Sequence, residues 1–288
     1  MINKCLFPAA GYGTRFLPAT KAVPKEMLPI LTKPLLQYGV EEALSAGIQN
    51  MAIVTGRGKR SIEDHFDNSF ELKLQLQGTS KEHYLEEIDN LIDKASFTYV
   101  RQQKMLGLGN AILTGEPLIG NEAFAVILAD DLCDSGSNNV ISQMVKIYKK
   151  YKCSIVAIEE VSRKDVHNYG IVSGQFIDGS DNIIRVNSMI EKPSENELKD
   201  FDYNNVNLGL TSGYMGIIGR YILTPDIFEI LKNTQTNKNN EVQITDALLK
   251  QALDDKVIAF KFSGNRFDCG TVEGFVKATN YFAKSLGV

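Results

Sequence analysis

Short apolar runs rich in strand-forming residues alternate with amphipathic segments through the first half of the chain, and this alternation most constrains its fold. The runs at residues 4–7, 51–55, 97–101 and 123–129 predict strands. Over residues 36–47, apolar side chains recur at helical spacing with acidic side chains off that stripe. Because strand–helix–strand units build a sheet flanked by helices, the sequence predicts an α/β fold with a mixed, mostly parallel central sheet.

The second half of the chain changes character near Tyr169. Residues 169–175 and 183–190 are β-like runs separated by a turn-forming cluster at 178–182, which predicts a small antiparallel excursion from the main sheet. The polar segment 233–240 predicts an exposed loop. Segment 70–78 has no pattern that decides its structure. Elsewhere the pattern predicts helices at 59–66, 81–95, 225–231, 243–253 and 272–285, and strands at 214–218 and 257–262.

Composition excludes several classes of partner and indicates a compartment. The 288 residues include 31 Lys and Arg against 35 Asp and Glu, a net charge of −4, so no global basic field attracts nucleic acid or an anionic membrane. No apolar run approaches membrane length, and the N-terminus lacks the pattern of a leader peptide. Cys5, Cys133, Cys153 and Cys269 are too dispersed for a zinc site or a disulfide framework. We therefore expect a cytoplasmic protein with one large domain.

The loop after the first predicted strand has the residues of a phosphate site. Gly11 and Gly13 remove side chains where a backbone must approach a ligand closely. Arg15, Lys21 and Lys25 then supply three cations. Arginine offers a planar fork of donors and lysine a compact charge, so this loop is suited to a polyphosphate.

Two familiar phosphate-binding loops do not fit this segment. A dinucleotide-binding fingerprint requires a third glycine where Phe16 stands. A Walker A loop that starts at Gly11 requires Gly-Lys where Phe16 and Leu17 stand. From these residues alone, a plain glycine turn with surface cations remains open.

Two adjacent carboxylates follow the predicted strand at 123–129. Asp130 and Asp131 are placed at the C-terminal end of a central strand, where ligands bind in open α/β sheets. A carboxylate there is suited to Mg²⁺, which takes one or two protein oxygens together with phosphates and water. A helix cap or a turn is the alternative for such a pair.

A second group of candidates lies in the excursion. Glu191 and Lys192 end its second strand, just before Pro193. Neighbours on an extended segment point to opposite sides, so both side chains reach one ligand only where the backbone bends. Gly170 and Gly213 lie beside strands, which indicates either a close backbone approach or a bulge.

Two polar residues stand near the ends of other predicted elements. Gln102 follows the strand at 97–101, and its amide can pair with both a donor and an acceptor on a base edge. Asp268 precedes the helix at 272–285, where a ligand role and a loop or cap role are both open.

The segment 5–29 resembles the signature of the sugar-nucleotide pyrophosphorylases, which is Gly-x-Gly-Thr-Arg followed by a proline and then by Pro-Lys. Together with the other candidates, the resemblance extends from Pro8 to Gly274. It implies a Rossmann-like nucleotidyltransferase fold and a single domain over residues 1–288. About residues 1–135 would form its nucleotide-binding part, and about 136–288 its sugar-binding part and C-terminal helices.

The resemblance also implies roles for individual residues. It implies that the catalytic residues are Arg15, Lys25 and Lys192. The nucleotide-binding residues that it implies are Ala10, Gly11, Gly13, Thr14, Glu26, Gln102 and Gly107. Its sugar-binding residues are Asp131, Gly170, Glu191 and Gly213. Its ligands for Mg²⁺, the implied cofactor, are Asp130 and Asp268.

The implied reaction joins UTP and glucose 1-phosphate into UDP-glucose and releases pyrophosphate, by in-line attack of the sugar phosphate on the α-phosphorus. The Glu26-Met27-Leu28-Pro29 segment resembles that of the members that use UTP, whereas thymidylyltransferase relatives usually carry Gln after the lysine. The alternative is therefore a thymidylyltransferase or another nucleotide preference on the same fold. A non-catalytic homologue is disfavoured because Arg15, Lys25, Asp130 and Lys192 are all present, and a nicotinamide enzyme is disfavoured by Phe16. We expect small-molecule partners only, in a homodimer or homotetramer.

Overall fold

A nine-stranded mixed sheet runs through the protein. The computed structural model describes residues 1–177, 179–204 and 213–287, so position 178 of the predicted turn cluster lies outside the described residues. The sheet has the order β5-β4-β1-β6-β11-β8-β12-β10-β9, and only β11 and β10 run opposite to the other strands. Its strands are β1 (Lys4–Pro8), β4 (Asn50–Thr55), β5 (Ser96–Arg101), β6 (Phe124–Ile127), β8 (Ser154–Ser162), β9 (Gly170–Phe176), β10 (Ile183–Glu191), β11 (Gly213–Leu223) and β12 (Val257–Lys261).

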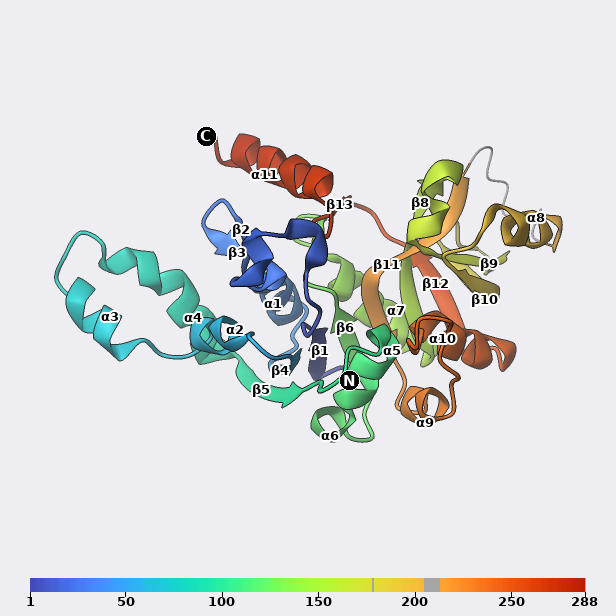
Figure 1. Ribbon diagram of the computed structural model, residues 1–288, viewed down its shortest axis with the longest axis horizontal. Coiled ribbons are helices and arrows are strands. Elements are labelled where there is room, and N and C mark those ends of the chain that lie inside the picture. Colours follow the sequence, from blue (N-terminus) through green and yellow to red (C-terminus); the bar gives the residue numbers. More distant parts are fainter. Residues whose placement is uncertain (178, 205–212, 288) are drawn as a thin grey trace.

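Helices cover both faces of this sheet (Figure 1). They are α1 (Leu35–Ser45), α2 (Arg60–His65), α3 (Phe70–Leu76), α4 (Glu86–Lys94), α5 (Gly107–Thr114), α6 (Glu116–Ile119), α7 (Val140–Tyr151), α8 (Glu195–Asn204), α9 (Ile227–Lys232), α10 (Ile244–Leu253) and α11 (Val272–Leu286). Short 3₁₀ turns are η1 (Thr14–Phe16), η2 (Ala19–Lys21), η3 (Lys25–Met27), η4 (Glu82–Leu85) and η5 (Arg163–Asn168). Helices α3 and α4 project at one end of the molecule, and β9, β10 and α8 lie at the other.

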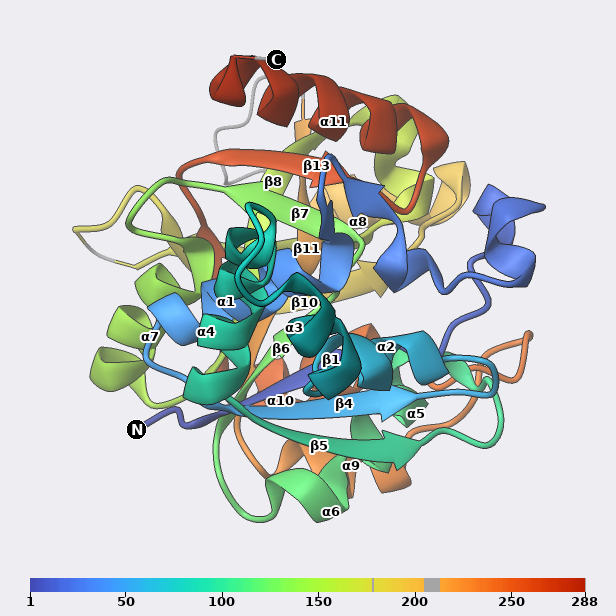
Figure 2. The same cartoon turned by 90° about the vertical axis from the view of Figure 1, so that its left-hand side faces the viewer.

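The central strands are apolar throughout because they are buried on both faces. In β1, Leu6 belongs to the core cluster that includes Ile112 of α5 and Leu248 of α10. Its neighbours Cys5 and Phe7 belong to the opposite cluster, with α1 and α7. Figure 2 shows β1, β4 and β5 side by side at the lower part of the sheet, as their parallel pairing requires.

Strand β11 belongs to both parts of the sheet. One of its edges pairs with β8, and the other pairs with β6 through Arg220–Leu223 and with β9 through Met215 and Gly216. A register shift against β8 falls between Ile217 and Tyr221. There Arg220 turns into the core and pairs with Glu42 of α1, with Nη2 2.8 Å from Oε2. Loss of one partner of such a buried pair costs roughly 3–5 kcal/mol.

Two small ribbons complete the architecture. Strands β13 (Asn265–Asp268) and β7 (Asp131–Asp134) are antiparallel and place Asp268 opposite Asp131. Helix α11 begins beside this ribbon, where the Thr271 side chain caps it by accepting from the Gly274 amide. The second ribbon joins β2 (Pro29–Ile30) and β3 (Lys33–Pro34) ahead of α1.

The predicted α/β class, the mostly parallel sheet and the antiparallel excursion are confirmed, with differences in detail. The single helix expected at 81–95 is divided into η4 and α4, and segment 70–78 contains α3. The strand expected at 214–218 is longer, because β11 continues through its register shift to Leu223. Elements β7, β8, β13 and α7 are not among those expected from the sequence. Among the described residues, no helix is both long and apolar enough to cross a membrane.

Candidate active site at the junction of two cavities

Two cavities meet near the C-terminal ends of β1 and β6. One, of about 410 Å³, is lined by the loop after β1 and is called here the glycine-loop cavity. The other, of about 330 Å³, includes Lys192 in its lining and is called the Lys192 cavity. Residues that line both are Gly107, Leu108, Leu128, Asp130 and Glu241.

The glycine-loop cavity collects most of the predicted nucleotide residues. Gly13 has a φ of 64°, and a Cβ there would lie 3.0 Å from the Cβ of Lys25. Its carbonyl oxygen accepts a hydrogen bond of 2.7 Å from the Thr20 hydroxyl, which holds the loop closed. Glycine is therefore required here both by conformation and by space. The predicted residues in this lining are Ala10, Gly11, Gly13, Thr14, Lys25, Gln102 and Gly107.

Lys25 and Asp130 form an ion pair on the boundary between the cavities. Lys25 Nζ lies 2.5 Å from Asp130 Oδ2, and each side chain is about one quarter exposed. Burial lowers the pKa of Lys25, but the Asp130 and Glu26 carboxylates outweigh it and the pKa lies above its ordinary value. Burial raises the pKa of Asp130, but Lys25 outweighs it and the pKa lies below its ordinary value. Both groups are therefore charged at neutral pH.

Glu26 lies behind the cavity wall and not in the lining. Its side chain is 1% exposed, and its Oε2 accepts a hydrogen bond of 2.6 Å from Lys59 Nζ. Burial raises the pKa of Glu26 more than Lys59 and Lys25 lower it. Among the described residues, its Oε1 has no hydrogen-bond partner. The structure therefore makes Glu26 a buried partner of Lys59 beside Lys25.

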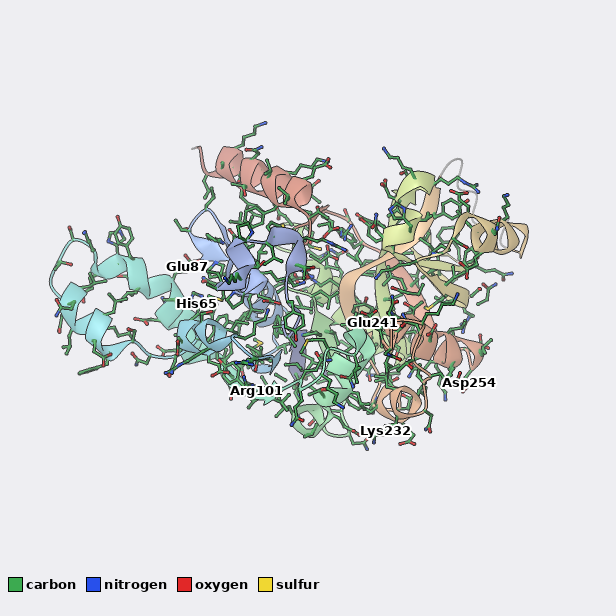
Figure 3. The ribbon with its side chains drawn as sticks, viewed as in Figure 1. His65, Glu87, Arg101, Lys232, Glu241 and Asp254 are labelled. Atoms are coloured by element: carbon green, nitrogen blue, oxygen red, sulfur yellow. The ribbon has the colours of Figure 1, made fainter. Side chains whose placement is uncertain are left out.

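The Gly107–Gly109 segment packs closely against Glu241 and Val242, beside the junction of the two cavities. The Gly109 amide donates to the carbonyl of Val242 at 2.9 Å, and a Cβ on Gly109 would lie 2.7 Å from that oxygen. A Cβ on Gly107 would lie 2.9 Å from the Cβ of Glu241. These close approaches bring Glu241 to the centre of the molecule, into the linings of both cavities (Figure 3).

The backbone bends at Lys192, as the strand geometry required. Lys192 has a φ of 46°, and its amide donates to the carbonyl of Tyr169 at 2.9 Å. Glu191 and Lys192 therefore both reach the Lys192 cavity, with Lys192 Nζ 3.6 Å from Glu191 Oε1. Glu191 Oε2 accepts from the Thr245 hydroxyl, and a Cβ on Gly170 would lie 3.0 Å from each of those two oxygens.

Asp131 lines the Lys192 cavity, but the protein engages both of its carboxylate oxygens. Oδ2 accepts from the Gly219 amide in the β11 register shift, and Oδ1 accepts from Nε of Arg266. Its nearest neighbours are therefore protein groups, so Asp131 shapes the wall of the predicted sugar site.

Gly213 is the predicted sugar residue that the structure does not bring to the junction. It is absent from both linings, and a Cβ there would meet the Glu160 side chain at 2.5 Å. Close packing between β11 and β8 accounts for this glycine.

Asp130 and Asp268 approach one point from different elements. A Cβ on Gly270 would lie 2.9 Å from Asp130 Oδ2 and 3.0 Å from Asp268 Oδ1. Burial and the charges of Asp131 and Asp130 raise the pKa of Asp268, against the effect of Arg266. Arg15 also reaches this point, since its Nη1 donates to the Gly270 carbonyl at 3.4 Å.

The charge of the Lys192 cavity favours a cation. Three cationic and five acidic side chains line it, a formal charge of −2. Within the described part of the chain, no group of three or more His, Cys, Asp or Glu residues is arranged as a metal site. A two-carboxylate site nevertheless suits Mg²⁺, because this ion is commonly held by one or two carboxylates and by substrate phosphates. Asp130 and Asp268 fit such a site.

Several lining residues were not predicted from the sequence. Glu241, Thr245 and Arg266 stand in segments whose pattern indicates only a helix start or a loop. The one available signal was the alternation of polar and apolar residues at the start of α10, in which Glu241, Gln243 and Thr245 are the polar ones. This segment has neither a phosphate-loop motif nor the spacing of metal ligands, so only the folded structure shows that it lines the cavity.

The chain belongs to the nucleotidyl transferase family, whose model matches residues 6–285. It is 56% identical over 287 residues to a UTP–glucose-1-phosphate uridylyltransferase of Pseudomonas aeruginosa, which covers 99% of this chain and 98% of that protein. A protein of the same name from Staphylococcus epidermidis is 44% identical, over 98% of this chain and 92% of that protein.

Solved structures agree with this assignment. A UDP-glucose pyrophosphorylase in its apo form is 55% identical, with a TM-score of 0.89 and coverage of 99% of both chains. A UDP-glucose pyrophosphorylase complexed with UDP-glucose is 53% identical, with a TM-score of 0.86 and coverage of 99% of this chain and 100% of that chain. The predicted nucleotidyltransferase fold is confirmed, and so is the predicted resemblance to UTP–glucose-1-phosphate uridylyltransferases.

Proposed function

We propose that this protein is an enzyme that transfers UMP from UTP to glucose 1-phosphate, giving UDP-glucose and pyrophosphate. The observation that carries the proposal is that Asp130 lines both cavities and pairs with Lys25 where they meet. Two polyanions held in the two cavities meet at this point. The relatives that match nearly the full chain at 44% and 56% identity have the name of this activity.

The reaction needs positioning and charge more than it needs a nucleophilic side chain. An oxygen of the sugar phosphate attacks the α-phosphorus of UTP, the new P–O bond forms, and the bond to the β-phosphate oxygen breaks to release pyrophosphate. Phosphoryl-type transfer of this kind depends on alignment and on neutralised charge. On this proposal, Lys25 from the glycine-loop cavity and Arg15 from the lining of the Lys192 cavity neutralise the phosphates of UTP at the junction. Lys192 neutralises the sugar phosphate.

We propose Mg²⁺ as the cofactor, held by Asp130 and Asp268. The support is the approach of both carboxylates to the point beside Gly270 and the negative charge of the lining. When bound, the ion supplies positive charge to the substrate phosphates.

The nucleotide-binding and sugar-binding roles follow the same division. Ala10, Gly11, Gly13, Thr14, Gln102 and Gly107 receive UTP, and Gly170 and Glu191 receive the sugar. Asp131 supports the sugar wall, and Glu26 acts from behind the lining. We assign Gly213 to packing between β11 and β8.

The test is pyrophosphate release with UTP, glucose 1-phosphate and Mg²⁺. Omission of each component in turn should abolish release, and EDTA should abolish it reversibly. Replacing UTP by dTTP, ATP or GTP, and glucose 1-phosphate by galactose 1-phosphate, measures both preferences. Equal rates with UTP and dTTP would contradict the uridylyl assignment.

The thymidylyl alternative has less support. The solved structure titled a putative glucose-1-phosphate thymidylyltransferase is 21% identical, and this likeness extends to the fold alone.

We also propose a cytoplasmic location and a homodimer or homotetramer. The four cysteines are free thiols, and Cys5 and Cys269 are buried, which suits a reducing compartment. Light scattering of the purified protein measures its oligomeric state.

A further inference from the structure

A buried network of charged groups forms one wall of the Lys192 cavity, with Arg266 at its centre. The Arg266 side chain is 8% exposed. Its Nε donates to Asp131 Oδ1 and its Nη1 to Glu159 Oε1, both at 2.5 Å. Nη1 also donates to the Tyr169 hydroxyl at 2.9 Å, and the guanidinium carbon lies 5.1 Å from the centre of that ring.

The partners of Arg266 come from different elements of the fold. Asp131 begins β7 directly after Asp130, the residue on the boundary between the cavities. Tyr169 directly precedes β9, and its carbonyl receives the amide of Lys192. A continuous chain of contacts therefore runs from Asp130 through Arg266 to the backbone of Lys192.

The charge of the network favours a positioning role over a phosphate-binding role for this arginine. Two carboxylates, Asp131 and Glu159, face a single guanidinium, so the three groups together have a formal charge of −1. Burial lowers the pKa of Arg266, but these two carboxylates outweigh it and keep the guanidinium charged. No positive charge is left unmatched for a substrate phosphate, and what Arg266 supplies is geometry.

The planar guanidinium suits this task because it holds several partners in fixed directions, whereas a lysine ammonium has no such preferred plane. We propose that Arg266 is a positioning residue that sets the spacing between the Asp130 side and the Lys192 side of the cavity. It thereby sets the affinity for the sugar phosphate. This inference rests on the proposed function, because it names a determinant of the same site.

The test is the split between the two Michaelis constants in Arg266→Lys and Tyr169→Phe variants. Arg266→Lys keeps the charge and loses the fork, so the KM for glucose 1-phosphate should rise about tenfold. Tyr169→Phe removes one hydroxyl and leaves no charge unpaired, so that KM should rise about threefold. The KM for UTP should stay within about twofold in both variants, because the nucleotide lies in the other cavity.

Matched variants control for general damage to the fold. Arg185→Lys changes an exposed arginine of β10, and Tyr281→Phe removes a hydroxyl that donates to Asp134 outside both cavities. Both should keep the two Michaelis constants of the unchanged protein. Thermal unfolding of every variant identifies any that do not fold, and Tyr169→Phe carries the test if Arg266→Lys is one of them.

The inference is overturned if folded Tyr169→Phe and Arg266→Lys proteins keep the original KM for glucose 1-phosphate. It is also overturned if the two Michaelis constants rise equally, which is the result expected of a purely structural role. Absence of pyrophosphate release by the unchanged protein would instead reject the proposed function itself.

Discussion

The two cavities are built by opposite means. The glycine-loop cavity is lined on one side by the loop after β1, in which Gly11 and Thr14 are exposed. The wall of the Lys192 cavity is a preformed network in which Arg266 joins Asp131, Glu159 and Tyr169. On the proposed assignment, the nucleotide phosphates would be met by the loop and by Lys25, whereas the sugar phosphate would meet a wall already fixed by ion pairs.

The difference lies in what supports each cavity. The glycine loop is supported from behind by the buried ion pair Glu26–Lys59, whereas the Lys192 cavity is supported by the Arg266 network. Neither residue of the first support belongs to a lining, whereas Arg266, Asp131 and Tyr169 of the second line the Lys192 cavity. Substitutions behind the loop should therefore change stability first, and substitutions in the Lys192 cavity should change kinetics first.

The largest expected effect is on stability, in a Lys59→Met variant. The change leaves the Glu26 carboxylate buried without its partner, which costs roughly 3–5 kcal/mol. Urea unfolding measures the loss. A Glu26→Gln/Lys59→Met double variant should recover most of it, since no charge is then left buried. The exposed Lys277→Met, which breaks a surface pair with Glu273, should leave the midpoint unchanged.

The next effect is on turnover, in Asp130→Asn. Loss of the carboxylate removes the partner of Lys25 and one proposed Mg²⁺ ligand, and should reduce kcat about a hundredfold or more, about 2.7 kcal/mol. Pyrophosphate release at saturating substrates measures it. Asp134→Asn is the matched control, because this residue ends strand β7, which begins directly after Asp130, and lies outside both cavities. A folded Asp130→Asn protein with near-normal kcat would contradict the metal assignment.

Lys192→Met should have a smaller and more selective effect. Its ammonium is half-exposed, so the KM for glucose 1-phosphate should rise and kcat should fall, together about tenfold in kcat/KM. The kcat/KM for UTP at saturating sugar phosphate reports the kcat loss alone. Lys261→Met at the end of β12, which pairs with Glu160 outside the cavities, should leave both values unchanged.

The smallest expected effect is on the pH dependence of stability, through His65. Burial lowers the pKa of His65, in the helix α2 that follows Lys59. The unfolded chain therefore binds a proton more readily than the folded protein, so stability rises with pH through this range and is lost as pH falls from about 6.5 through the lower folded pKa. His65→Gln should reduce this loss between pH 7.5 and 5. An equal slope in His65→Gln and in the unchanged protein, with exposed His83→Gln as control, would contradict it.

The local sequence pattern was enough to predict an element whose own residues define it. Strands β1, β4 and β5 were predictable because each is a continuous run of strand-forming side chains. Strands β7 and β13 were not, because they are four residues long, carry aspartates and are defined by their pairing with each other. The glycine loop belongs to the first kind, and most of the residues predicted for nucleotide binding line one cavity there.

Contacts between distant segments account for the rest of the site. Arg266 looks like an ordinary loop arginine until β13 brings it against Asp131, and Glu241 looks like part of an exposed loop until Gly107 and Gly109 admit it. Contacts with distant segments also explain why Glu26 and Gly213 are not in the linings. Glu26 pairs with Lys59, and Gly213 packs against Glu160, and neither partner is near in sequence.

Strand β11 sets a mechanical limit on how this enzyme admits its substrates. Its hydrogen bonds to β6, β8 and β9 tie both halves of the molecule into one sheet, so a hinge opening between the halves would have to tear a strand from its neighbours. Entry and exit are therefore left to the segments that line the cavities without belonging to the sheet. These are the glycine loop and the stretch that carries Glu241, so we expect the motion that admits substrates to occur there and not within the sheet.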